Sequence, residues 1–378
     1  MRTGVLVACL VALPLCLAGP AIKFNRWFRP LCRPGSRTCS WNGIKSGSWR
    51  QRNSARENSQ NCKDGVRIRK NVNSLSRQER SRLVSALQSS IQRGEYQKVG
   101  NYHGAPTSLC GGQPCCPHGT NGFLPWHRLF MVHMEEELGY ALPYWDWTEE
   151  GAVPSLWERI KAPIQQGADG QCSLDSFTSR DPRAQVNTNE LKARVEVALM
   201  EETFEDFSEE LIIPHNQLHF GMGCDMRVID TSAYDPVFYL HHTYIDYVFA
   251  FWQELQRLRG HNKVPAIQEL EDSFPPFNNR RYNNKSLTLQ NNRGRDTFEY
   301  TARYCYKYQD LKFDGLTPAQ FLRLHATVPT HIFIGIVVPK IMPTGYITFD
   351  LCLAGRCVQA GKVASFSIAV TTIININR

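Results

Sequence analysis

Two of the histidines have a spacing that could bind a metal ion. His215 and His219 are four residues apart, so on an α-helix both imidazoles project from one face and their nitrogens could share one ion. Packed or surface histidines also occur in such pairs, so the pair alone is weak evidence. A zinc protease would carry a glutamate directly after the first histidine, but Asn216 stands there instead.

Upstream, further histidines lie in Tyr102-His103-Gly104, in Cys116-Pro117-His118 and at His127. Four blocks of sequence around the histidines resemble, in the right order, the two copper motifs of tyrosinases and molluscan hemocyanins. The resemblance covers roughly residues 66–360 and weakens on either side. The blocks are Phe123-Leu-Pro-Trp-His-Arg-Leu-Phe130, Leu142-Pro-Tyr-Trp-Asp-Trp147, His215-Asn-Gln-Leu-His219 and Asp235-Pro-Val-Phe-Tyr-Leu-His-His242.

The resemblance implies a type-3 centre with two copper ions, each held by three neutral imidazoles. The implied ligands are His103, His118 and His127 for one ion, and His215, His219 and His242 for the other. Imidazole suits copper, and an all-nitrogen set leaves open positions where dioxygen, the implied co-substrate, can bridge the metals. His241 and His242 would lie about 100° apart on a helix, so only one can readily face the metal, and the resemblance selects His242.

The resemblance gives roles to three more residues. It implies a thioether bond between Cys116 and the ring carbon of His118. Asn216 is a candidate for orienting the water that takes the phenol proton, although its side chain could instead hydrogen-bond along its own helix. Phe220 is expected to face the entering phenol at the mouth of the pocket.

The other histidines are expected to be structural or surface residues. Metal-bound imidazoles usually donate their second nitrogen to a carboxylate or a carbonyl. Asp235 and Asp246 are candidates for this outer shell, with helix capping as the alternative for Asp235. The residues assigned no metal role are His133, His241, His261, His325 and His331.

Helical periodicity predicts the elements that hold these residues. Ser76 and Glu79 form a capping box that begins a helix, and Pro125 suits the first turn of another helix. Together the predicted helices indicate a mainly α fold, a four-helix bundle around the dinuclear copper site. The aromatic residues of 143–147 are expected to pack in its core. The predicted helices span 77–97, 125–139, 189–213 and 236–259.

Composition divides the rest of the chain. The apolar run at 4–17 is too short to span a membrane and ends in small residues, so it predicts a signal peptide and secretion. β-branched runs at 332–338 and 346–353 predict a small β domain. The short tail after Gly361 leaves two alternatives open, a truncated domain or an end that reflects how the sequence was assembled. The predicted regions are a signal peptide at 1–20, a basic, Cys-containing, loop-rich N-terminal arm at 21–75, the dicopper domain at 76–320 and the β domain at 321–378.

The net charge of +8 is unevenly distributed. Residues 22–82 carry sixteen Lys or Arg and three acidic residues, a local +13, and Arg2 adds one more, so the remainder sums to about −6. A solvated charge run is one interpretation. An acidic extracellular polymer bound at the arm is the other. Nucleic acid is not expected as a partner outside the cell, and no membrane span is indicated.

The cysteines indicate a disulfide framework in an oxidising compartment. Thirteen cysteines include Cys9 and Cys16 in the predicted signal peptide, so eleven remain and one cannot form a disulfide. Cys110 with Cys115, and Cys352 with Cys357, are plausible pairs. The pairing of Cys32, Cys39, Cys62, Cys172, Cys224 and Cys305 stays open. Asn284-Lys285-Ser286 is a glycosylation sequon.

Three functions fit these observations. The leading hypothesis is a phenoloxidase that oxidises monophenols or o-diphenols to o-quinones, with a small phenol or the tyrosyl side chains of matrix proteins as substrate. The first alternative is an oxygen carrier of the hemocyanin type. The second is an extracellular matrix protein whose copper site no longer turns over. A single copper unit with a shortened β domain favours the enzyme.

Overall fold

A computed structural model describes most of the chain between Cys62 and Thr327 and the backbone of four later strands. Contacts divide the chain into two compact units, residues 52–322 and residues 1–51 together with 323–378. The predicted signal peptide, nearly all of the N-terminal arm and the sequon lie outside the described residues. Described are 62, 65–104, 107–110, 114–158, 160–164, 177–181, 186–261, 264–278, 292–327, 331–335, 346–353, 356–364 and 371–375.

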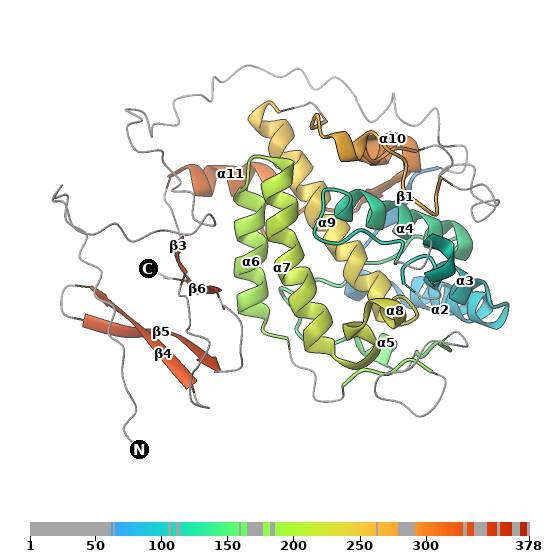
Figure 1. Cartoon of the computed structure of the whole chain (residues 1–378), viewed down its shortest axis with the longest axis horizontal. Helices are drawn as coiled ribbons and strands as arrows, with labels where there is room; N and C mark the ends of the chain where they lie inside the picture. The colour runs from blue at the N-terminus through green and yellow to red at the C-terminus, as the bar shows by residue number, and fades with distance from the viewer. Residues whose placement is uncertain are drawn as a thin grey trace. The chain divides into compact units, whose positions relative to one another are not determined.

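The part from 65 to 327 is mainly helical, as predicted (Figure 1). Short 3₁₀ helices, among them η4 (Cys224–Arg227), connect the longer elements. None of the described helices is long and apolar enough to cross a membrane. The elements are β1 (Arg67–Arg69), α2 (Arg77–Gln92), α3 (Glu95–Gly100), α4 (Phe123–Leu138), α5 (Ser155–Glu158), α6 (Thr188–Met200), α7 (Phe204–Met222), α8 (Ile229–Ser232), α9 (Pro236–Arg259), α10 (Tyr300–Tyr304), β2 (Tyr306–Tyr308) and α11 (Pro318–Thr327).

Local signals account for where several helices begin and end. Ser76 and Glu79 form the predicted capping box at the start of α2. The predicted helix over 77–97 is divided into α2 and α3, because Gly94 adopts a left-handed backbone with φ of 71°. α4 begins two residues before Pro125 and ends at Gly139, which is also left-handed.

The prediction of one helix over 189–213 was wrong. The chain leaves the helix at Glu201, which is extended, and Thr203 caps a new helix by accepting a hydrogen bond from the backbone nitrogen of Asp206. α6 and α7 then lie side by side (Figure 1). A side-chain oxygen that accepts a hydrogen bond from a free backbone N–H can start a new helix. The apolar periodicity of the sequence continues through such a point, so it did not predict the break.

Two helices that carry histidines, α4 and α9, are buried on all sides over most of their length. Every residue of α9 from Pro236 to Trp252 is buried, and so is every residue of α4 from Phe123 to Glu135. A helix that is apolar all round belongs in the centre of a fold, and α4 packs against α9 there. Trp145 and Trp147 are 0% exposed, so the aromatic segment packs in the core as predicted, each large side chain contributing roughly 2–3 kcal/mol.

A buried charge network joins α4 and α9 to both strands of the first unit. Arg69 of β1 donates to Glu135 of α4 and to Asp246 of α9, both at 2.7 Å. Arg128 of α4 donates to the other oxygen of Asp246. The hydroxyls of Tyr306 and Tyr308 also donate to Asp246, at 2.7 and 2.5 Å. Two arginines and two carboxylates thus pair in the interior, where an unpaired charge would be very costly.

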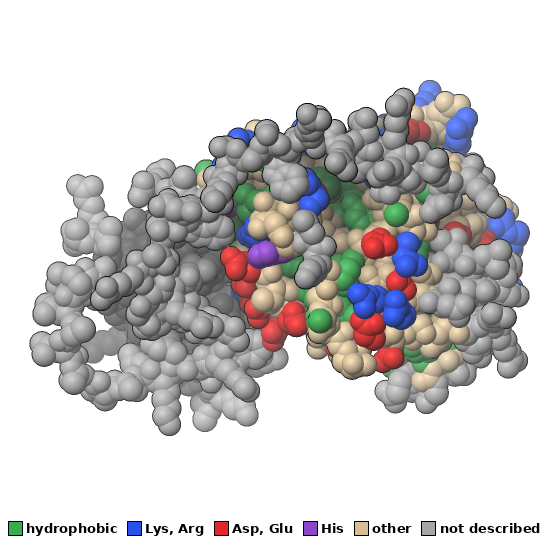
Figure 2. Space-filling model, turned by 90° about the horizontal axis from the view of Figure 1, so that it is seen from above, with side chains coloured by type: hydrophobic (Ala, Val, Ile, Leu, Met, Phe, Trp, Pro, Cys, Tyr) green, Lys and Arg blue, Asp and Glu red, His purple; other side chains and the backbone are tan. Residues whose placement is uncertain are grey.

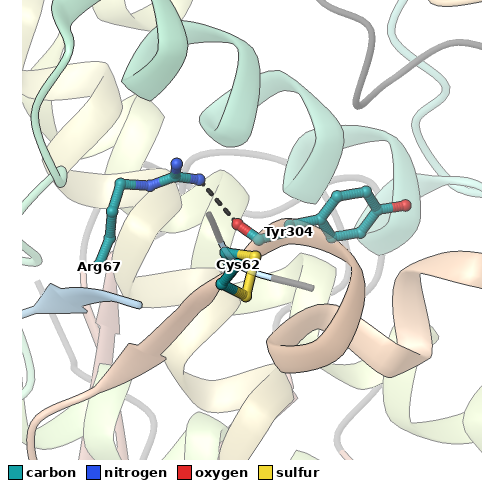
Figure 3. Close-up of a disulfide and its surroundings, with 4 residues drawn as sticks. Cys62, Arg67 and Tyr304 are labelled. Carbon is teal, nitrogen blue, oxygen red and sulfur yellow. Dashed lines mark hydrogen bonds between the residues drawn. A yellow bond between two sulfur atoms is a disulfide. The ribbon is translucent and has the colours of Figure 1, made fainter. Parts of the chain in front are cut away.

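Disulfides support this arrangement. Cys62 and Cys305 are bonded and hold the start of β1 beside the start of β2; close by, Arg67 donates to the Tyr304 carbonyl at 2.8 Å (Figure 3). A bond across 243 residues removes about 5 kcal/mol of chain entropy from the unfolded state. The predicted Cys110–Cys115 disulfide is present, and Cys224 is also disulfide-bonded.

The C-terminal strands form two antiparallel pairs. β3 (His331–Gly335) pairs with β6 (Thr371–Asn375), and β4 (Tyr346–Leu353) pairs with β5 (Arg356–Ala364). Cys352 and Cys357 are Cα partners in the register of β4 and β5; the disulfide between them stays a prediction. The segment expected to be a short tail after Gly361 therefore includes the end of β5 and all of β6.

Candidate metal centre

Helices from distant parts of the sequence bring seven imidazoles together. α4 supplies His127, α7 supplies His215 and His219, and α9 supplies His241 and His242. His103 follows α3, and His118 lies in the loop before α4. Four of the seven are 1–2% exposed and His241 is 0% exposed. Burial lowers the pKa of these imidazoles, that of His219 to about 4, so they are neutral at pH 7.

Backbone carbonyls orient four imidazoles, and the longest of these contacts joins His118 Nδ1 to the Cys116 carbonyl at 3.3 Å. The Nδ1 atom of His103 donates to the Ile229 carbonyl at 3.0 Å, and that of His127 donates to the Phe123 carbonyl at 2.8 Å. His219 donates in the same way to the Met226 carbonyl at 2.6 Å. A carbonyl can only accept, so the proton of each neutral ring is on Nδ1. Each Nε2 is left with a free lone pair, which a metal ion requires.

The free Nε2 atoms converge. His242 Nε2 lies 3.3 Å from His215 Nε2 and 3.3 Å from His219 Nε2. The Nε2 atoms of His103 and His127 are buried and have no hydrogen-bond partner among the described residues. Lone pairs facing one another in a dry interior repel each other, and a cation between them removes that repulsion. The donor set therefore fits copper, which accepts imidazole nitrogen readily.

The three upstream imidazoles form a second group beside this one. The ring centroid of His103 lies 5.5 Å from that of His118 and 5.5 Å from that of His127, and His118 and His127 are 5.1 Å apart. The ring of His127 stacks on that of His242 at 4.4 Å and joins the two groups. The six predicted ligands thus lie in two adjacent sets of three.

His241 is closer to the site than the sequence indicated. Its ring stacks on that of His215 at 5.1 Å, and its ligand atoms lie within 4.8 Å of those of the other three histidines in the group. Both of its nitrogens are buried without a hydrogen-bond partner among the described residues. His215 of α7 contacts both His241 and His242, so an angle of about 100° between neighbouring residues on α9 does not keep either one out of the site.

The other predicted site residues lie around the histidines. Asn216 accepts a hydrogen bond from His215 Nδ1 at 2.9 Å through its side-chain oxygen. Phe220 is 59% exposed, directly after His219. Cys116 is buried, and its free sulfur lies within 4.8 Å of the ligand atoms of His103 and His118. His133 stacks instead on Tyr102 at 5.0 Å.

Neither candidate carboxylate contacts a proposed metal ligand among the described hydrogen bonds, and helix capping, the alternative given for Asp235, is confirmed. Asp246 is occupied by the two arginines and two tyrosines described above, and Asp235 caps α9 at Val237 and pairs with Arg180 at 2.8 Å. Backbone carbonyls take the role that the sequence gave to these carboxylates. Sequence reasoning missed Met226 and Ile229 because every residue has a carbonyl, and only the tertiary structure decides which one meets an imidazole.

Gly104 is essential to one of these contacts. A Cβ atom at this position would lie 2.5 Å from the Ile229 carbonyl oxygen and 2.6 Å from Asp230 Cα. Gly104→Ala should therefore displace Ile229 and break its hydrogen bond with His103. We expect an affinity about tenfold lower for one of two copper ions, measured by titration against a copper chelator. Gly94→Ala, which loses stability at a left-handed position far from a ligand, should keep both affinities; equal losses in both variants would contradict the assignment.

Comparisons with known proteins agree with this geometry. The family model for the common central domain of tyrosinase matches residues 93–185 and 163–255. The chain is 32% identical over 333 residues to the hemocyanin beta-C chain unit G of Helix pomatia, covering 79% of this chain and 80% of that protein. It is also 32% identical to hemocyanin 2 of Megathura crenulata over 80% of this chain. The chain spans 10%, 11% and 26% of the length of the first three curated relatives.

Solved structures share the fold. A functional unit of Octopus hemocyanin matches with a TM-score of 0.65 and 29% identity, covering 82% of this chain and 86% of that one. A tyrosinase from Burkholderia thailandensis matches with a TM-score of 0.53 and 17% identity over 82% of this chain and 90% of that one. The fold therefore accommodates both kinds of protein.

Proposed function

The chain belongs to the type-3 copper family of tyrosinases and molluscan hemocyanins, and we propose that it is a copper-dependent phenoloxidase. The reaction converts two o-diphenols and one dioxygen into two o-quinones and two waters; monophenols are the second substrate class. The observation that carries the proposal is the exposed ring of Phe220, 59% accessible directly after the partly buried His219. An aromatic residue at the edge of a buried centre suits the approach of a phenol.

We assign one copper to His103, His118 and His127 and the other to His215, His219 and His242. Bound copper supplies the redox chemistry with dioxygen. The carbonyls of Phe123, Met226 and Ile229 hold three rings with Nε2 available to bind the metals. The four-helix bundle around the centre stays a proposal, built on the helices predicted at 77–97, 125–139, 189–213 and 236–259; the structure has α2 and α3, α4, α6 and α7, and α9 in these regions.

Further residues act on the substrate side in this proposal. Phe220 contacts the ring of the entering phenol. Asn216 keeps the proton of His215 on Nδ1 through its 2.9 Å hydrogen bond. Its amide nitrogen remains available to orient the water that takes the phenol proton.

An oxygen carrier is the second candidate, because the relatives reported above are named hemocyanins. The same six imidazoles serve both functions, so the ligands do not distinguish them. A matrix protein with a silent site is a third possibility, and intact ligand geometry argues against it.

Oxygen consumption separates these functions. The intact, copper-loaded protein should consume dioxygen with 4-methylcatechol, without prior proteolysis, because the aromatic edge of the site is exposed. The measurement is oxygen uptake together with quinone absorbance, before and after limited proteolysis of residues 323–378. Reversible dioxygen binding without quinone would establish the carrier, and activity only after proteolysis would indicate a zymogen.

Cys116 provides a test of the implied thioether. Its sulfur is buried, free and near His118, and a covalent bond would hold an imidazole that no helix positions. After copper loading, reduction and alkylation, we expect the peptide that contains Cys116 and His118 to be unlabelled and lighter by two hydrogens. The other cysteines of the mature chain serve as labelled controls. A labelled Cys116 in active protein would contradict the bond but not the copper assignment.

We also propose that the protein is secreted. The disulfides at Cys62–Cys305 and Cys110–Cys115 support this, because such bonds persist in oxidising compartments. The predicted signal peptide, the thioether, the four regions of the chain and an acidic extracellular polymer as partner of the basic arm remain proposals. On the face shown in Figure 2, acidic and basic side chains of the described residues are intermixed.

A further inference from the structure

One short segment touches both groups of imidazoles. Residues 224–232 form η4 and α8, and within them the Met226 carbonyl holds His219 while the Ile229 carbonyl holds His103. We refer to residues 224–232 as the strap. The strap contacts one proposed ligand of each copper. The residues between Met226 and Ile229 in the sequence therefore have their backbone next to the proposed copper centre.

The strap is held firmly in place. Asp225 is 0% exposed, and its carboxylate accepts hydrogen bonds from the backbone nitrogen and the hydroxyl of Ser179, at 2.7 and 3.1 Å. The hydroxyl of Thr231 donates to the Asp225 carbonyl at 3.1 Å, and Cys224 is tied by a disulfide. A fixed segment can present a charged group at a constant position without paying the entropy of ordering a loop.

Arg227 lies between Met226 and Ile229 in the sequence, and its side chain is exposed. Its guanidinium carbon is 5.3 Å from the centroid of the Phe220 ring, the aromatic ring that follows His219. Arg227 takes part in none of the ion pairs formed among the described residues. The nearest acidic residues in the strap are Asp225, which is buried on Ser179, and Asp230, which is exposed.

We propose that Arg227 is a specificity-determining residue that selects phenols with an anionic tail, such as a carboxylate attached to the ring through a short chain. The phenol ring would lie against Phe220 and the carboxylate would pair with the guanidinium, which recognises two oxygens at once. A guanidinium above an aromatic face still has N–H groups at its edge that are free to donate to a carboxylate. This inference deepens the phenoloxidase proposal and rests on it only for turnover.

The test uses three catechols that differ in tail charge: 3,4-dihydroxyphenylpropionate, 4-methylcatechol and dopamine. In Arg227→Gln, kcat/KM for the acid should fall about five- to tenfold, mainly through KM. The kcat/KM for the neutral catechol should change less than about twofold. Arg227→Lys should keep part of the preference as a point charge, and raising the salt concentration should weaken it. Arg80→Gln removes the same charge from an exposed position on α2. Its kcat/KM values for the three catechols should equal those of the parent.

A binding measurement separates this inference from the proposed activity. 3-Phenylpropionate and 3-phenylpropylamine cannot be oxidised as phenols, so calorimetry on the copper-loaded chain reports tail recognition alone. Tighter binding of the acid that is lost in Arg227→Gln supports the inference even if no catechol is oxidised. Equal changes in affinity for the acid and the amine in Arg227→Gln, or no preference for the acid in the parent, would overturn the inference, whether or not the protein is an oxidase.

Discussion

Replacing His242 with alanine should lower the copper content from two ions per chain to one. His242 Nε2 is the atom that lies 3.3 Å from both His215 Nε2 and His219 Nε2, so its removal leaves only two nitrogens at that position. Two imidazoles hold copper far more weakly than three, and oxidation of catechols should fall to the background rate because both ions are needed. The measurements are copper per chain by atomic absorption and oxygen uptake.

His241→Ala is the matched control for this experiment. The two residues are adjacent on α9, equally buried and of the same type, so the losses of packing are similar. We expect His241→Ala to retain two coppers and to unfold at a somewhat lower temperature. A content of one copper in this variant as well would make His241 a ligand and contradict the set of six.

Replacing Asp246 with asparagine should destabilise the fold by about 3–5 kcal/mol, since it leaves Arg69 and Arg128 with Glu135 as the only carboxylate in the buried network. Asp246 is one turn after His242 and Arg128 directly follows His127, so α4 and α9 should also separate near the copper ligands. Chemical denaturation gives the free energy of unfolding. Glu95→Gln, which breaks an exposed pair with Lys98 on α3, should cost less than about 0.5 kcal/mol.

The same buried network should make the stability of the fold depend on pH. Burial alone would raise the pKa of Asp246, but Arg128 and Arg69 lower it more strongly, and the net shift is downward. A carboxyl group with a lower pKa in the folded state stabilises the protein above its unfolded pKa, and that contribution is lost as the pH falls through the folded value. Stability of the parent should therefore decline at acidic pH, and the decline should be smaller in Asp246→Asn. Identical pH profiles for parent and variant would contradict this role.

The sequence by itself predicted the proposed metal ligands and the helices that carry most of them. The four blocks and the spacing of His215 and His219 predicted imidazole pairs on helical faces, and α4, α7 and α9 carry them. Capping residues and glycines are local signals, so Ser76 and Gly139 marked ends of helices correctly. The pairing of Cys110 with Cys115 was also predictable, because a short loop leaves few alternatives.

Only the tertiary structure decided which groups surround the metal ligands. Met226 and Ile229 act through backbone carbonyls, which no residue type reveals. Asp246 pairs with Arg69 across 177 positions of sequence. Helical periodicity describes neighbouring residues only and cannot predict a contact between residues so far apart in the sequence. Three further features depend on how separate helices cross: the break between α6 and α7, the position of His241 near the site, and the position of Arg227 over Phe220. The packing of the whole core fixes these crossings, and no local sequence pattern does so.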